Sequence, residues 1–87
     1  MPARLTGDYD RSFMRVESAK QVEMIVQSVI HDHGLSMVRL DHVRPDRLGW
    51  LVTVTRGKTT TSSFPIRQGT PVWVRLVIER GLGVRSD

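Results

Sequence analysis

The segment from Thr70 to Gly81 constrains the fold of this chain more than any other stretch. Thr70 is a good helix N-cap, Pro71 suits the first helical position, and Gly81 suits a helix stop. Between these ends only three side chains are polar: Arg75, Glu79 and Arg80. A helix of this composition must have most of its circumference covered by other parts of a protein.

The same segment also carries the alternation of a strand. Val72, Val74 and Leu76 alternate with Trp73 and Arg75, a period-2 pattern that suits a pleated sheet. The end signals and a length of about ten residues favour a helix. We therefore predict a helix over residues 70–81, with a strand as the alternative.

The composition limits the other possibilities. A chain of 87 residues corresponds to one domain. It has no cysteine, which excludes disulfides and thiolate metal sites. No apolar run approaches the roughly 20 residues that a bilayer span needs, and the first residues lack the apolar core of a secretory signal. We expect a cytoplasmic protein with no membrane partner.

Residues 18–33 have the clearest helical pattern. Ser18 and Gln21 have the spacing of a capping box, and Gly34 suits the C-terminal stop. The apolar residues follow the i, i+3, i+4, i+7, i+8 spacing of one helix face: Val22, Ile25, Val26, Val29 and Ile30. The pattern predicts an amphipathic helix with one buried face.

Three strands are predicted next, over residues 36–43, 50–55 and 59–64. Residues 44–49 are predicted to form a turn in which Pro45 presets φ and Gly49 takes a positive φ, and residues 56–58 a second turn. Pro65 cannot donate to a ladder, so the third strand should end there or lie at an edge.

The predicted order of elements is helix, three antiparallel strands, helix. We expect an α+β fold in which both helices cover the sheet face of Trp50, Val52 and Val54. Arg39, Asp41, Thr53 and Thr55 would then lie on the other face. Residues 1–11 read as a flexible tail and residues 12–87 as a single domain, to which residues 12–16 can add a short strand.

The sequence supports no catalytic or metal site. The Gly57-Lys58-Thr59 triplet lacks the earlier glycine of a phosphate-binding loop, and a strand rather than a helix follows it. The histidines of His31-Asp32-His33 are spaced i, i+2 on a helix and point apart. Asp41 and His42 are adjacent strand residues, which point to opposite faces. We predict no catalytic residue, no metal and no cofactor, and a binding protein is favoured over an enzyme.

The basic residues of the predicted hairpins provide the leading functional hypothesis. Arg44 and Arg47 flank the first turn, Arg56 and Lys58 flank the second, and Arg39 lies between them. The net charge is +4 and the isoelectric point about 10.7. Such a surface can follow the phosphates of RNA or DNA. The alternative is a solvated sheet edge whose charges prevent aggregation between sheets.

A homodimer is the second hypothesis. Trp is enriched in interface hot spots, and a two-fold dimer would hide the apolar surface of the last helix. The candidate interface residues are Val72, Trp73, Val74 and Val77. The alternative is a monomer in which this helix is simply well buried.

The predicted α-β-β-β-α order resembles the double-stranded-RNA-binding fold, and within it the HicA toxin family. The likeness rests on Arg67-Gln68-Gly69-Thr70, on Gly81-Leu82 and on the junction from His33 to Arg39. The lysine pattern that opens the second helix of the double-stranded-RNA-binding family is absent, and Leu40-Asp41-His42 replaces the Gly-Ser-His signature of HicA. The resemblance implies the fold and, as a third hypothesis, a degenerate toxin-like RNase with no catalytic residue carried over.

Overall fold

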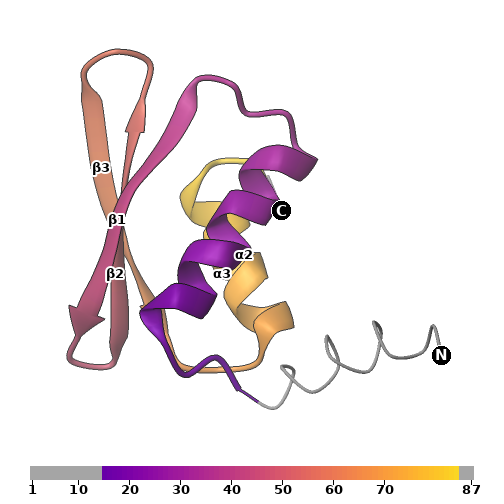
Figure 1. The fold of residues 1–87 in the computed structure, drawn as a ribbon, viewed down its shortest axis with the longest axis vertical. Coiled ribbons are helices and arrows are strands. Elements are labelled where there is room, and N and C mark those ends of the chain that lie inside the picture. Colours follow the sequence, from indigo (N-terminus) through magenta and orange to yellow (C-terminus); the bar gives the residue numbers. More distant parts are fainter. Residues whose placement is uncertain (1–14, 85–87) are drawn as a thin grey trace, which may run out of the picture.

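A computed structural model describes residues 15–84 of the chain. Two helices and three strands follow one another in the predicted order: α2 (Ala19–Asp32), β1 (Val38–Asp46), β2 (Gly49–Arg56), β3 (Thr60–Arg67) and α3 (Pro71–Gly81). The strands form one antiparallel sheet in the order β1-β2-β3, and both helices lie on the same face of it (Figure 1). The predicted α+β class and topology are confirmed.

Both helices begin at the predicted caps. The Ser18 hydroxyl accepts a hydrogen bond from the Gln21 amide at 3.2 Å, and the Gln21 side chain accepts from the Ser18 amide at 3.0 Å, which completes the capping box. The Thr70 hydroxyl accepts from the Trp73 amide at 3.3 Å. Residues 71–81 are therefore a helix, and the strand alternative is wrong.

The first hairpin is tighter than predicted. β1 continues through Pro45 and Asp46, so that only Arg47 and Leu48 form the turn. Pro45 fits because β1 is an edge strand, where a missing amide hydrogen need not cost a ladder bond. Pro65 likewise lies inside β3, which is an edge strand. Of the two alternatives from the sequence, a strand that ends at Pro65 and a strand at an edge, the second is correct.

Gly49 does not have the positive φ that the sequence predicted. Among the described residues the positive-φ glycines are Gly34, Gly57 and Gly83. Gly49 instead belongs to β2, where an added Cβ would collide with the carbonyl oxygen of Ile66 on β3. The absent side chain thus permits close approach of the β3 backbone.

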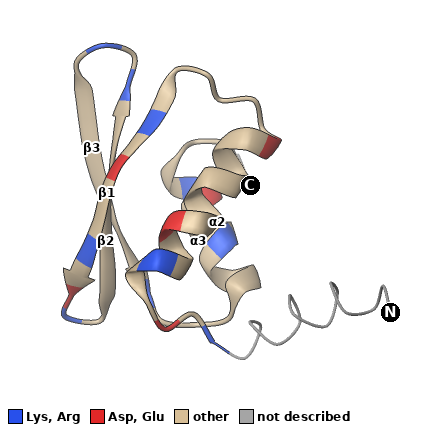
Figure 2. Cartoon of the chain, in the orientation of Figure 1, with Lys and Arg blue, Asp and Glu red and all other residues tan. Residues whose placement is uncertain are grey.

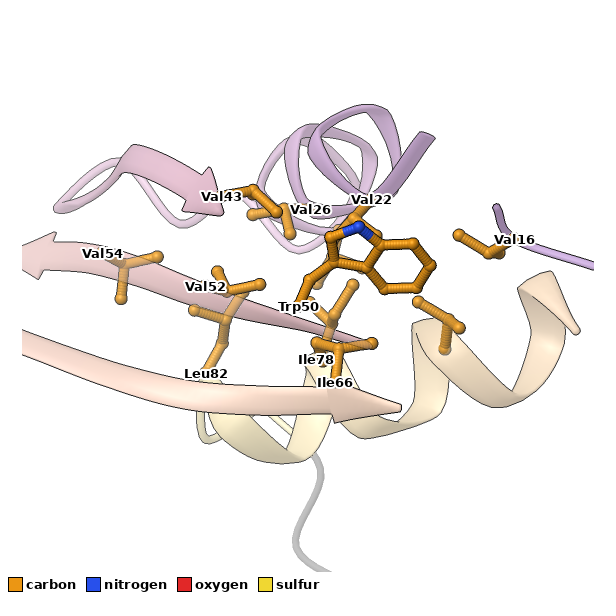
Figure 3. Packing of buried hydrophobic residues seen from close by; sticks show 12 residues of the cluster. Val16, Val22, Val26, Val43, Trp50, Val52, Val54, Ile66, Ile78 and Leu82 are labelled. Atoms are coloured by element: carbon orange, nitrogen blue, oxygen red, sulfur yellow. The ribbon is translucent and has the colours of Figure 1, made fainter. Parts of the chain in front are cut away.

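The core lies between the sheet and the helices. Trp50, Val52 and Val54 of β2 are buried on this inner face, as predicted. In Figure 3 the Trp50 indole lies among Val16, Val22 and other aliphatic side chains. α2 packs over β1, and α3 packs over β3 and against α2. The buried side chains from the helices include Val22, Val26, Val29, Val74 and Ile78.

The predicted tail over residues 1–11 and most of the predicted extra strand lie outside the described residues. Arg15 and Val16, the described part of that strand, are not in the sheet. The Val16 amide donates to the carbonyl of Gly69 at 2.8 Å, and its side chain is buried, which fixes the chain entering α2 beside the start of α3. Within residues 15–84, no helix is long and apolar enough to cross a membrane.

Candidate nucleic-acid interface

The outer face of the sheet is left open by the two helices (Figure 1). Because side chains alternate along a strand, Leu51, Thr53 and Thr55 of the central strand point to this face. In register with them on β3 lie Thr61 and Ser63. A band of hydroxyl groups therefore runs across the middle of this face. Thr61 and Ser63 are exposed, whereas neighbouring side chains bury Thr53 and Thr55.

Hydrogen bonds between these side chains hold the band in place. The hydroxyls of Thr53 and Ser63 are 2.9 Å apart, and those of Thr55 and Thr61 are 3.4 Å apart. Thr55 also donates to Oδ2 of Asp41 at 2.6 Å. Each hydroxyl has one donor and two acceptor positions. Thr53 and Thr55 are buried, so the capacity for further hydrogen bonds with a ligand lies with the exposed hydroxyls of Thr61 and Ser63.

A β-bulge in β1 changes which residues reach the outer face. Leu40 pairs with Val54, but the next pair is His42 with Thr53, which leaves Asp41 as an extra residue. Paired residues of an antiparallel sheet point to the same face, so His42 shares the outer face with Thr53. Asp41 reaches the same face through its hydrogen bond to a β2 hydroxyl. The prediction that Asp41 and His42 point to opposite faces is wrong because of this bulge.

Four of the five predicted basic residues border the open face. Arg39 and Arg44 pair with Thr55 and Leu51 and therefore point to the outer face from β1. Arg47 lies in the β1–β2 turn and Lys58 in the β2–β3 turn, at opposite ends of the sheet (Figure 2). All four are exposed.

Arg56 has a different position. It follows Val54 by two residues, which places it on the inner side of β2, and its Nη2 donates to the carbonyl of Gly81 at 3.3 Å. It thus satisfies a carbonyl at the C-terminal end of α3, where a cation is favourable. Its guanidinium belongs to the packing between sheet and helix, apart from the other four basic groups.

Arg67 was missed by the sequence prediction. The third strand was expected to stop near Pro65, but β3 continues to Arg67, which pairs with Gly49. Ile66 points into the core, so Arg67 points outward by alternation and is exposed. Continuing the alternation through the proline would have found it.

Charge is unevenly divided between the two layers of the molecule. The sheet and its turns, residues 38–67, carry six basic and two acidic side chains: Arg39, Arg44, Arg47, Arg56, Lys58 and Arg67 against Asp41 and Asp46. The described helical part carries four of each: Arg15, Lys20, Arg75 and Arg80 against Glu17, Glu23, Asp32 and Glu79. The excess positive charge of the described residues lies entirely on the sheet layer (Figure 2).

In the helix layer, an ion-pair network joins α2 to α3. Arg75 donates to Asp32 at 2.8 Å, to Ser28 at 3.1 Å and to Glu79 at 3.3 Å. The hydrogen bond from Arg75 is the main cause that lowers the pKa of Asp32, with partial burial opposing it and His31 adding to it. This charge pairing serves the contact between the helices.

His31, in the last turn of α2, and His33, the residue that caps its C-terminal end, are part of the same region. Nε2 of His33 lies 3.3 Å from Oε2 of Glu79, and Nδ1 of His31 lies 3.6 Å from Asp32. Among residues 15–84 there is no group of three His, Cys, Asp or Glu side chains placed to hold a metal ion.

The four predicted dimer-interface residues differ in how far the packing of α3 buries them. Val72 and Trp73 are 63% and 49% exposed, at the start of the helix. Val77 is half-buried, and Val74 is fully buried in the core, where a second chain does not reach it. Trp73 lies against Gly69, where an added Cβ would come within 2.9 Å of its ring.

Comparison with models of protein families, with curated proteins and with solved structures gives no match. The resemblance to the double-stranded-RNA-binding fold and to the HicA family stays a prediction from the sequence.

Proposed function

We propose that the protein binds the phosphate backbone of RNA or DNA with the outer face of its sheet. The observation that carries this proposal is the charge division: six basic against two acidic side chains on the sheet layer, and equal numbers on the described helical part. All of the six except Arg56 border the outer face. Phosphate contacts by Arg and Lys supply most non-specific nucleic-acid affinity.

The arrangement of the open face supports this mode of binding. Arg44 on β1 and Arg67 on β3 flank the central strand, which separates them by two strand spacings, roughly 10 Å. The hydroxyl of Thr53 lies on the central strand and bonds that of Ser63 on β3, and Ser63 is exposed. Guanidinium groups supply charge and bidentate hydrogen bonds to phosphate, and hydroxyls supply neutral ones. His42 adds an imidazole ring that can stack on an unpaired base.

The two carboxylates on the outer face, those of Asp41 and Asp46, limit where a nucleic-acid backbone can cross the sheet. Asp41 accepts from Thr55 and lies 3.7 Å from Nε of Arg39, which reduces its effect on a bound phosphate. Asp46 lies at the end of β1 next to Arg47. The path of least repulsion crosses the sheet between these acids, over the row that Arg44, Leu51 and Pro65 form.

Fluorescence anisotropy with labelled single- and double-stranded RNA and DNA, over a range of salt concentrations, tests the proposal. The double variant Arg44→Ala/Arg67→Ala should lose about tenfold or more in affinity at low salt, and its plot of log affinity against log salt should become shallower by about 2 units. The matched control, Lys20→Ala/Arg80→Ala, removes the same charge from exposed helix positions and should bind as the parent does. No binding at low salt, or equal losses in both variants, would refute the proposal.

A further inference from the structure

The two edges of the sheet differ in how they are protected against another strand. β1 is protected along its length: the bulge at Asp41 interrupts its ladder, Pro45 removes a donor, and Arg39, Arg44 and Asp46 are charged. β3 pairs with β2 without a register shift and has a neighbour on one side only. From Thr60 to Phe64 it carries neither a charge nor a proline. The edge of β3 is thus a regular, unprotected strand of five residues.

The prolines indicate which backbone groups of β3 face outward. Pro65 lies opposite Leu51, and Pro45 lies opposite Trp50 on the other edge. Consecutive residues of a central strand direct their N–H and C=O groups to opposite neighbouring strands. Trp50 and Leu51 are consecutive, so the backbone groups of Trp50 can point to β3 and those of Leu51 to β1. The nitrogens of Pro45 and Pro65 then both face away from β2, where a missing N–H costs no ladder bond. Counting back from Pro65 in steps of two then places the amides and carbonyls of Ser63 and Thr61 on the free edge.

We propose that the edge of β3 pairs with β3 of a second copy of this chain, antiparallel, with the two-fold axis at Ser62. This register places Thr61 opposite Ser63 of the second copy, and both of these residues have outward-facing backbone groups. They form hydrogen-bonded pairs on either side of a non-hydrogen-bonded pair of Ser62 residues. The result is a continuous six-stranded sheet in which the two outer faces adjoin.

A second copy fits this edge for reasons of chemistry. An isologous pairing requires a strand that tolerates itself in reverse, which a segment of uncharged residues does. The side-chain pair that it creates, a threonine opposite a serine, already occurs within the sheet, where the hydroxyls of Thr53 and Ser63 are 2.9 Å apart. Thr60, Thr61, Ser62 and Ser63 are all exposed, so no described part of the chain occupies the position.

The mass of the protein in solution, measured by light scattering or sedimentation without nucleic acid, tests the pairing. The parent should have twice the chain mass of 9.9 kDa. Ser63→Pro removes an outward amide and should give a folded monomer, as should Thr61→Lys, which adds a charge to the edge. Circular dichroism checks that both variants remain folded. The pair Val72→Ser and Trp73→Ser, placed on α3, should stay dimeric.

A cysteine variant tests the register itself, because the chain has no native thiol. Non-hydrogen-bonded partners have Cα atoms about 4.5 Å apart, within the range that a disulfide spans. Ser62→Cys should therefore cross-link to a dimer on mild oxidation, whereas Ser36→Cys, exposed in the α2–β1 connection, should not. A parent that stays monomeric at high concentration, a dimer that survives Ser63→Pro, or a dimer that only the α3 variants dissociate would each overturn the proposal. None of these results depends on whether the outer face binds nucleic acid.

Discussion

The two faces of the central strand β2 differ in the interactions that their side chains make: apolar packing on the inner face and hydrogen bonds on the outer face. Val52 and Val54 point to the helices and are removed from water completely. Thr53 and Thr55 point to the open face, and although neighbouring side chains cover most of their surface, they keep hydrogen-bonding partners there. Neighbouring residues of one strand thus have different roles. The inner face supplies the apolar burial that stabilises the fold, and the outer face holds polar groups at fixed positions through hydrogen bonds between side chains.

The largest effect should come from placing the same polar residue on each face. Val52→Asn puts an amide without partners into the core and leaves a gap, which should cost about 4 kcal/mol or more. Thr53→Asn, one residue along, replaces a side chain that already has a polar partner, the hydroxyl of Ser63, and should cost about 1 kcal/mol. Urea denaturation of both variants measures the difference. Equal losses would show that the outer face is a second core face.

The network between the helices should give the next largest effect. Arg75→Met keeps the aliphatic part of the side chain but removes one partner each from Asp32, Ser28 and Glu79, and Glu79 is only 8% exposed. The free energy of unfolding should fall by about 1 to 3 kcal/mol. The control Arg80→Met, at an exposed position of the same helix, should change it by less than about 0.5 kcal/mol. If both variants cost the same, the network contributes nothing.

The contribution of the bulge residue Asp41 to stability can be tested through its hydrogen bond with Thr55. Thr55→Val keeps the shape of the side chain but removes the donor to Asp41, 2.6 Å away. We expect a loss of about 1 kcal/mol, with the partly exposed carboxylate turning to water. Thr61→Val, whose hydroxyl lies at 3.4 Å from Thr55, serves as control and should have a smaller effect. A larger loss in the control would place the important contact on β3.

The smallest effect should be the acid dependence due to Asp32. Its pKa is lowered in the folded protein, chiefly by the hydrogen bond from Arg75. Its contribution is therefore fully present above its unfolded pKa, about 3.9, and is lost as the pH falls through its folded pKa. Melting temperatures of the parent and of Asp32→Asn should differ at neutral pH and converge in acid. A difference that persists or grows in acid would contradict this assignment.

Local signals in the sequence predicted the elements well. The capping box at Ser18 and the Thr70-Pro71 start specify helices through contacts within one turn, so no tertiary information is needed. The alternation from Trp50 to Thr55 likewise identified the buried face of β2. Segment 70–81 was assigned correctly because its end signals outweighed its alternation.

The errors depend on contacts between elements that are distant in the sequence, which no local pattern reveals. Gly49 was read as a turn residue, but the reason for a glycine there is the carbonyl of Ile66, 17 positions along the chain. The bulge at Asp41 follows from how β1 pairs with β2, and it alone brings His42 to the outer face. Arg56 carries charge like its neighbours, yet only the packing of α3 shows that it binds the Gly81 carbonyl.

The helix network also bears on the order in which the chain can fold. Strand partners in both hairpins are at most 18 positions apart, as for Val38 with Arg56 and Gly49 with Arg67. Arg75, in contrast, joins residues 43 and 47 positions away. Closing the shorter loops costs less chain entropy, so the meander can form before the two ends meet. Docking of α3 against α2 would then be the step that converts a partly ordered hairpin sheet into the cooperative native state.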